Sequence, residues 1–132
     1  MSKPAAKKDD VIASPADIHM VHVPAPSGTV VVPLPHPFKG KLTQALSRNV
    51  RIQGKAAATA GSWGKNDPKH VAMGIKFQKE PSNKGRVFMG SKTVRINGKH
   101  AARAGDPVLT CNDPTDLPVG KIQANSTVKI GG

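Results

Sequence analysis

Two short patterns, each present three times, constrain the fold of this 132-residue chain more than any single residue does. The copies of the first pattern are KPAAKKDD at 3–10, GKAAATAGS at 54–62 and GKHAARAGD at 98–106. The copies of the second pattern are NVRIQG at 49–54, TVRING at 93–98 and TVKIGG at 127–132. Repetition of this kind means that one small structural solution is used several times around a shared axis or stack.

The order of the copies indicates a closed ring. One copy of the first pattern stands alone near the N-terminus, and one copy of the second stands alone at the C-terminus. We therefore expect a single domain over residues 1–132 with three pseudo-repeats, at about 3–53, 54–97 and 98–132. The two terminal half-units would together complete one unit, which brings Gly132 close to Lys3.

The composition favours a small β protein with many turns. Glycine and proline contribute 13 and 12 residues, too many for a helical protein, while the Val-x-Ile alternation argues against disorder. Three Phe, one Trp and no Tyr cannot build a large aromatic core, and a single cysteine excludes an internal disulfide framework. Small domains with thin cores are often stabilised by a metal or by oligomerisation. We expect a metal or a partner here.

The second pattern predicts three equivalent short strands whose two faces differ, because side chains alternate between the faces of a strand. We expect the apolar residues to line the interior: Val50, Ile52, Val94, Ile96, Val128 and Ile130. The cations between them, Arg51, Arg95 and Lys129, would form a positive collar on the other face.

A net charge of +12 raises nucleic acid or another polyanion as a partner. The cations are dispersed and no aromatic residues interleave with them, so the stacking platforms that bind single strands are missing. An acidic protein surface is at least as good a partner. A small basic β protein that binds nucleic acid or another polyanion is the alternative function.

Between the repeats the sequence predicts mostly extended chain and loops. Five prolines within 19–38 exclude a helix there and favour extended chain. A short helical turn is expected at 42–47 and an edge strand at 75–80, whereas 62–73 and 107–121 are expected to be loops.

Four potential metal ligands lie in the segments that follow the first pattern: His19, His36, His70 and Cys111. Similar separations from the pattern would bring His19, His70 and Cys111 together near a three-fold axis, and His36 could complete the set. Three imidazoles and one thiolate satisfy tetrahedral zinc in a closed structural site, although ligand type alone does not separate zinc from iron. The alternative is that the histidines are scattered loop residues and Cys111 is a small buried apolar group.

Two other histidines compete with this set. His22 follows His19 by three residues and would face the opposite side of an extended segment, so at most one of the two should bind. His100 stands where the other copies have Pro4 and Ala56, and we expect it at the surface. A metal-dependent hydrolase is a further alternative, but four protein ligands leave no open position and no catalytic triad or acid pair is evident. We do not expect an enzyme.

The third copy, TVRINGKHAARAGDPVLTCND at 93–113, resembles the repeat of PAAR-repeat proteins. These proteins form the spike tips of type VI secretion systems and related phage-tail-like contractile injection machines. The resemblance extends to the DIHMV and PLPHPF segments, but the other copies depart from the pattern. Thr59 and Ser62 replace Arg and Asp in the second copy, and Lys7 and Asp9 replace Arg and Gly in the first.

The resemblance implies an all-β fold, a conical, three-fold pseudosymmetric β-prism or β-helix-like repeat fold. Its pointed apex would be held by one structural zinc through His19, His36, His70 and Cys111. The implied function is a structural tip that caps a homotrimeric β-helical spike protein, one tip per trimer, and sharpens it for membrane penetration. Toxin or effector cargo and a transiently contacted target membrane would be further partners, and nucleic acid would not be one.

The chain has no apolar run long enough to span a bilayer, and MSKPAAKKDD lacks the apolar region of a signal peptide. We expect the protein to stay in the cytoplasm until it is loaded on the machine. It would then be exported or displayed at the tip of an extracellular particle.

Overall fold

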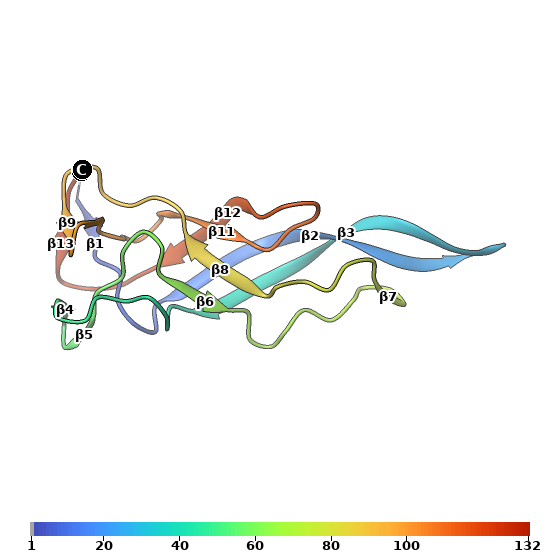
Figure 1. The fold of residues 1–132 in the computed structure, drawn as a ribbon, viewed down its shortest axis with the longest axis horizontal. Helices are drawn as coiled ribbons and strands as arrows, with labels where there is room; N and C mark the ends of the chain where they lie inside the picture. The colour runs from blue at the N-terminus through green and yellow to red at the C-terminus, as the bar shows by residue number, and fades with distance from the viewer. Residues whose placement is uncertain (1) are drawn as a thin grey trace.

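A computed structural model describes residues 2–132, and these residues form β-strands, turns and irregular chain without any helix. The all-β prediction is therefore confirmed. The molecule is elongated, with short ribbons and the C-terminus at a broad end and a single long hairpin at the narrow end (Figure 1). We name these ends the base and the tip. Within the described part of the chain, nothing forms a helix that could cross a membrane.

Three two-stranded ribbons form the base. They pair β1 (Lys3–Pro4) with β13 (Lys129–Ile130), β4 (Arg51–Ile52) with β5 (Lys55–Ala56), and β9 (Arg95–Ile96) with β10 (Lys99–His100).

The turns of two ribbons follow directly from their sequences. Gln53–Gly54 and Asn97–Gly98 have positive φ at both residues, which is the backbone of the two-residue type I′ turn that suits a twisted hairpin. Glycine adopts this conformation without steric cost. In the third ribbon the two strands come from opposite ends of the chain, and Lys3 pairs with Ile130.

A ring of backbone hydrogen bonds with three-fold pseudosymmetry joins the three copies of the first pattern. The N–H of Ala6 donates to the carbonyl of Ala102 at 2.9 Å, and the N–H of Ala102 donates to the carbonyl of Ala58 at 3.0 Å. The N–H of Ala58 closes the ring on the carbonyl of Ala6 at 3.0 Å. All three side chains are at most 1% exposed and pack in the main core, where a larger side chain has no room.

A second apolar cluster fills the base. Its members are Ala5, Ile52, Ala57, Ile96, Ala101 and Ile130. The predicted interior positions are thus correct for the three isoleucines. Val50 and Val94 are only half-buried, and Val128 is 39% exposed. Each valine precedes its two-residue strand, so it lies at the rim rather than inside.

The body between base and tip is a seven-stranded antiparallel sheet whose edges meet. Its strands are β2 (Val11–Ala25), β3 (Gly28–Lys41), β6 (Trp63–Lys65), β7 (Lys76–Phe77), β8 (Lys84–Val87), β11 (Pro107–Thr110) and β12 (Leu117–Gln123). The order is β3-β2-β12-β11-β8-β6, with β7 paired to β2. Isolated bridges from Gly40 to Asn66 and from Gln44 to Trp63 join the two edges, so the sheet closes into a narrow barrel.

The barrel encloses a main core of large apolar side chains packed against the central alanines. The large members are Ile12, Phe38, Leu42, Val87, Val108 and Ile122. Glycine allows the edges to meet, because a Cβ on Gly40 would collide with the carbonyl of Lys65 and one on Gly64 with the carbonyl of Lys41.

The β2–β3 hairpin continues past the rest of the sheet and forms the tip (Figure 1). The prolines of β3 lie on its free edge. Pro33 and Pro35 pair with Met20 and Ile18, whose carbonyls accept hydrogen bonds from the side opposite β3. These are non-hydrogen-bonded pairs, so the missing proline N–H groups would have faced outward. The tip edge therefore offers few donors to an additional strand.

Three local predictions were wrong or incomplete. Residues 42–47 form no helical turn, and the segments 62–73 and 107–121 are not only loops, because they contain β6, β11 and part of β12. The expected edge strand at 75–80 is reduced to β7.

Candidate metal centre

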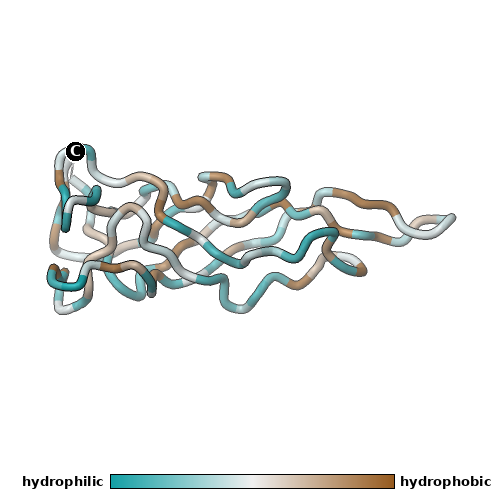
Figure 2. The backbone as a smooth tube through the Cα atoms, viewed as in Figure 1, coloured by the Kyte–Doolittle hydropathy of each residue, from teal (hydrophilic) through white to brown (hydrophobic). Residues whose placement is uncertain are grey.

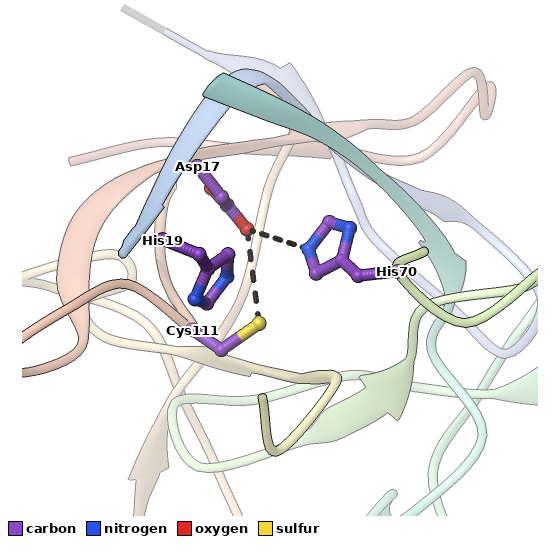
Figure 3. Close-up of side chains that lie close together, drawn as sticks. All are labelled: Asp17, His19, His70 and Cys111. Atoms are coloured by element: carbon purple, nitrogen blue, oxygen red, sulfur yellow. Dashed lines mark hydrogen bonds and ion pairs between the residues drawn. The ribbon is translucent and has the colours of Figure 1, made fainter. Parts of the chain in front are cut away.

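Four potential metal ligands from distant parts of the chain meet where the barrel narrows toward the tip hairpin. They are Asp17 and His19 of β2, His70 after β6, and Cys111 directly after β11. Their ligand atoms all lie within 4.8 Å of one another. Figure 3 shows the carboxylate, the two imidazoles and the thiol gathered in one small region.

The alternation of β2 places two of these ligands. Asp17 and His19 are two residues apart, so they lie on the same face of the strand, and both are buried. The hydroxyl of Thr110 donates to Oδ1 of Asp17 at 2.7 Å. Oδ2 of Asp17 remains directed at His70 Nε2, 3.6 Å away, and at Cys111 Sγ, 3.9 Å away.

The two residues after Cys111 hold its loop against β2. Oδ1 of Asn112 accepts the N–H of Ile18 at 2.6 Å, and Oδ2 of Asp113 accepts the N–H of Met20 at 2.9 Å. The N–H of Asp113 donates in turn to the carbonyl of Ile18 at 2.7 Å. These bonds take the place of strand pairing along this edge and fix the position of the thiol.

Two asparagines orient His70. Oδ1 of Asn83 accepts the backbone N–H of His70 at 2.8 Å, and Nδ2 of Asn66 lies 3.0 Å from its Nδ1. The N–H of Lys39 donates to Oδ1 of Asn66 and so fixes that amide. Nε2 of His70 is left facing the cluster.

The cluster is closed to solvent and contains unsatisfied polar atoms. The side chains of Asp17, His19, His70 and Cys111 are at most 2% exposed. Both ring nitrogens of His19 and Nε2 of His70 are buried and have no hydrogen-bond partner within residues 2–132. A buried polar atom without a partner costs about 1–3 kcal/mol. A bound metal would satisfy these nitrogens, and the donor set suits one, so the cluster can hold a metal ion.

Burial sets the protonation of these groups. It lowers the pKa of His19, against the opposing field of Asp113, and it lowers the pKa of His36, against the opposing hydrogen bond to the Leu34 carbonyl. Both imidazoles are therefore held in the neutral form that binds metals. Burial, with the nearby carboxylate of Asp17, raises the pKa of the Cys111 thiol to about 11.

His36, the fourth ligand predicted from the sequence, lies beside the cluster. Its ring centroid is 5.5 Å from that of His19 and 5.7 Å from that of His70. Its Nδ1 donates to the carbonyl of Leu34 at 2.9 Å, and its Nε2 accepts the N–H of Met73 at 3.1 Å. The structure thus brings three of the four predicted ligands into one group and places the fourth ring at its side.

Asp17 is the member of the group that the sequence analysis missed. The available signal was its spacing, since a residue two positions before His19 on a strand shares its face. His22 lies beyond the cluster, paired with Val31 and Lys76. His100 lies at the base, half-buried, with Nδ1 2.6 Å from the carbonyl of Ser91.

The cluster does not lie at the outermost point of the molecule. Beyond His19, the β2–β3 hairpin continues for six further residue pairs, from Met20–Pro33 to Ala25–Gly28. The expectation of a metal at the apex therefore needs correction. The ligands sit at the neck of the tip, because the proline-rich segment forms a long paired hairpin rather than a loop that returns to the axis.

The PAAR motif family model matches residues 78–132. The match contains the third copy of both sequence patterns, Cys111 and the strands β8 to β13, and it leaves out the histidines of the cluster. A comparison with curated proteins gave no match. The motif match, together with the all-β fold and the repeated sequence pattern, supports a PAAR-repeat protein.

Proposed function

We propose that this protein is the structural tip of a contractile injection machine, with its base seated on a homotrimeric β-helical spike protein. The PAAR motif suggests a spike-tip role in secretion or contractile systems. The observation that carries the capping proposal is the hydrogen-bonded ring of Ala6, Ala58 and Ala102. A monomer with three-fold pseudosymmetry can offer three similar surfaces to the three subunits of a trimer.

The base ribbons supply those surfaces. Arg51, Arg95 and Lys129 occupy equivalent places in the three ribbons and are exposed. The guanidinium groups of Arg51 and Arg95 make the same contact, with the carbonyls of Gly54 and Gly98 at 3.3 and 3.2 Å. This repetition supports a partner that makes an equivalent contact with each of the three ribbons of the base.

We further propose that the cluster holds one structural zinc. His19, His70 and Cys111 provide three ligands. The fourth is Asp17, which is already in the group, or His36, whose Nε2 would first release the N–H of Met73. Zinc would cross-link segments that are far apart in the sequence, with binding free energy on the order of 10–16 kcal/mol that couples directly to folding.

A site with four protein ligands has no open coordination position, which supports a structural role and a protein that is not an enzyme. The metal would brace the neck from which the hairpin projects.

The tip hairpin would be the leading end. Exposed apolar side chains lie on it and on the segment beside it, with Val30 47%, Val71 79%, Met73 63% and Ile75 57% exposed. Figure 2 shows hydrophobic residues along the hairpin and next to it. Such side chains support transient contact with a target membrane.

The test is the stoichiometry of the complex with the trimeric spike protein of the same machine, measured by analytical ultracentrifugation. We expect one chain per trimer. The double variant Arg51→Glu/Arg95→Glu should weaken binding by at least about 10-fold, because charge reversal at an interface opposes association. The matched control Lys39→Glu/Lys121→Glu on the side of the body should bind like the unmodified chain. Three chains per trimer, no complex, or equal weakening by both double variants would contradict the proposal.

A further inference from the structure

Three neighbouring strands on the side of the body present cations to solvent. On β3, β6 and β8 the inward positions are the buried residues Gly40, Gly64 and Gly85. The outward positions are Lys39, Lys41, Trp63, Lys65, Lys84 and Arg86. We name these six outward residues the basic face. It lies between the base and the tip hairpin, at the level of β6 and β8 in Figure 1.

Two adjoining grooves give this face its shape, and Trp63 lines both. The larger, of about 980 Å³, is lined by Lys39, Lys41, Lys65 and also Lys69. The smaller, of about 440 Å³, is lined by Lys84 and Arg86. The acidic residues of the two linings are Asp67 and Asp116. Among residues 2–132, none of the ion pairs involves a cation of the basic face.

The pairing of β6 with β8 sets two like charges against each other. Lys65 lies directly opposite Lys84, and Trp63 directly opposite Arg86. Like charges that face each other across antiparallel strands destabilise a sheet. The ammonium of Lys84 lies 4.8 Å from the ring centroid of Trp63, so it contacts the indole, and neither Lys65 nor Lys84 forms an ion pair within residues 2–132. An anionic ligand between the two lysines would turn this cost into attraction.

We propose that the basic face binds an acidic segment of another protein, laid in extended form along the larger groove. Carboxylates of the segment pair with the lysines of β3 and β6. An apolar side chain of the segment lies against Trp63, Val11 and Pro68, which form the apolar part of the groove lining. This binding site is separate from the base and from the metal cluster, so its test does not depend on the proposed capping function.

The chemistry of the face favours an acidic protein over nucleic acid. Four of its five cations are lysines, whereas bidentate phosphate recognition is characteristic of arginine. It has a single aromatic ring, with Lys84 over it, so it lacks the row of rings on which successive bases stack. A second copy of this chain is also disfavoured, because each copy carries a net charge of +12.

The protein carries its own reporter for the test. Trp63 is the only tryptophan and the chain has no tyrosine, so the intrinsic emission reports on this face. The probe is a ten-residue glutamate peptide with one central leucine. Its glutamine counterpart is the neutral control, and a ten-nucleotide thymidine strand is the nucleic acid control. The protein is titrated as purified, at low salt and again at higher salt.

We expect a saturable change in Trp63 emission with the acidic peptide alone, weakened by salt because the contact is between charges. The double variant Lys65→Gln/Lys84→Gln should bind the peptide at least about 10-fold more weakly. The double variant Lys79→Gln/Lys92→Gln, which removes the same charge elsewhere on the surface, should bind within about two-fold of the unmodified protein. Equal weakening by both double variants, tighter binding of the thymidine strand, or an unchanged emission would each overturn the proposal.

Discussion

The Sγ atom of Cys111 lies 3.9 Å from Oδ2 of Asp17, and both side chains are almost completely buried. Burial opposes ionisation of the thiol, and the negative carboxylate adds to that effect, so the pKa of Cys111 rises to about 11. Without a metal, the thiol of the folded protein therefore keeps its proton near neutral pH. A metal that binds the sulfur as thiolate has to displace this proton.

Zinc uptake near pH 7.5 should consequently release about one proton per ion from Cys111, since the metal ligand is the thiolate. Calorimetric titration in two buffers with different ionisation enthalpies measures the number released. A Cys111→Ser variant should bind zinc far more weakly. Stoichiometric binding without proton release would contradict ligation by this thiol.

Replacing Asp17 and His36 in separate variants should reveal which residue completes the ligand set. Loss of a ligand changes the coordination of the ion itself, whereas loss of a neighbouring group lowers affinity by about 10–100-fold with the coordination retained. We compare Asp17→Asn with His36→Gln, each loaded with cobalt, whose absorption spectrum reports coordination number. The variant with the altered spectrum identifies the ligand. Two unaltered spectra would mean that neither residue binds the metal.

The metal-free protein should be most stable between about pH 6.5 and 9.0. His19 and His36 have a lowered pKa in the folded state, so the unfolded chain binds more protons and stability falls as the pH drops below 6.5. Cys111 has a raised pKa, so the unfolded chain loses its proton first and stability falls from pH 9.0 toward 11.

Urea unfolding across this range in the presence of a chelator measures both limbs of the profile. The Cys111→Ser variant should lose the decline that the thiol contributes at high pH and keep the acid decline. An unchanged alkaline decline in that variant would assign it to other groups.

The alanine ring at the axis should tolerate no enlargement. Ala102→Val forces two methyl groups into a fully buried position, and overpacking of this kind costs about 1–3 kcal/mol of unfolding free energy. Ala16→Val, at an exposed position of β2, is the matched control and should change stability by less than about 0.5 kcal/mol. Chemical denaturation of the metal-loaded protein compares the two. Equal effects would mean that the ring has space to spare.

Reversing one charge of the facing lysine pair should stabilise the sheet. In Lys65→Glu an acid lies directly opposite Lys84, and an opposite-charge pair across strands contributes roughly 0.2–1 kcal/mol. The contact of Lys84 with Trp63 is kept. Thermal unfolding should show a higher midpoint for this variant than for Lys92→Glu. A lower midpoint would mean that Lys65 makes a favourable contact that outweighs the repulsion.

The sequence predicted the features that local sterics dictate. The axial alanines Ala6, Ala58 and Ala102 and the turn glycines Gly54 and Gly98 recur because each place in the repeat accepts little else. The strands of the body were harder to see. β6 and β8 present glycines inward, so they lack the apolar alternation by which a strand is usually detected.

The ligand group was only partly visible for a different reason. The histidines and the cysteine stand out by residue type, whereas Asp17 gains its place through Thr110, 93 residues away. An aspartate on a strand gives no local sign of such a contact. The length of the hairpin beyond His19 depends likewise on strand pairing across a turn. The prolines of β3 are compatible with this pairing but do not predict it.

The orientation of the tip hairpin has a mechanical consequence. Both of its strands run along the long axis of the molecule (Figure 1), and the hydrogen bonds between them lie across that axis. Thrust at the end of the hairpin compresses both strands along their length and does not pull them apart, whereas a sideways pull on one strand would open these bonds one after another. The tip hairpin is therefore stiffest along the direction in which the proposed injection machine would drive it.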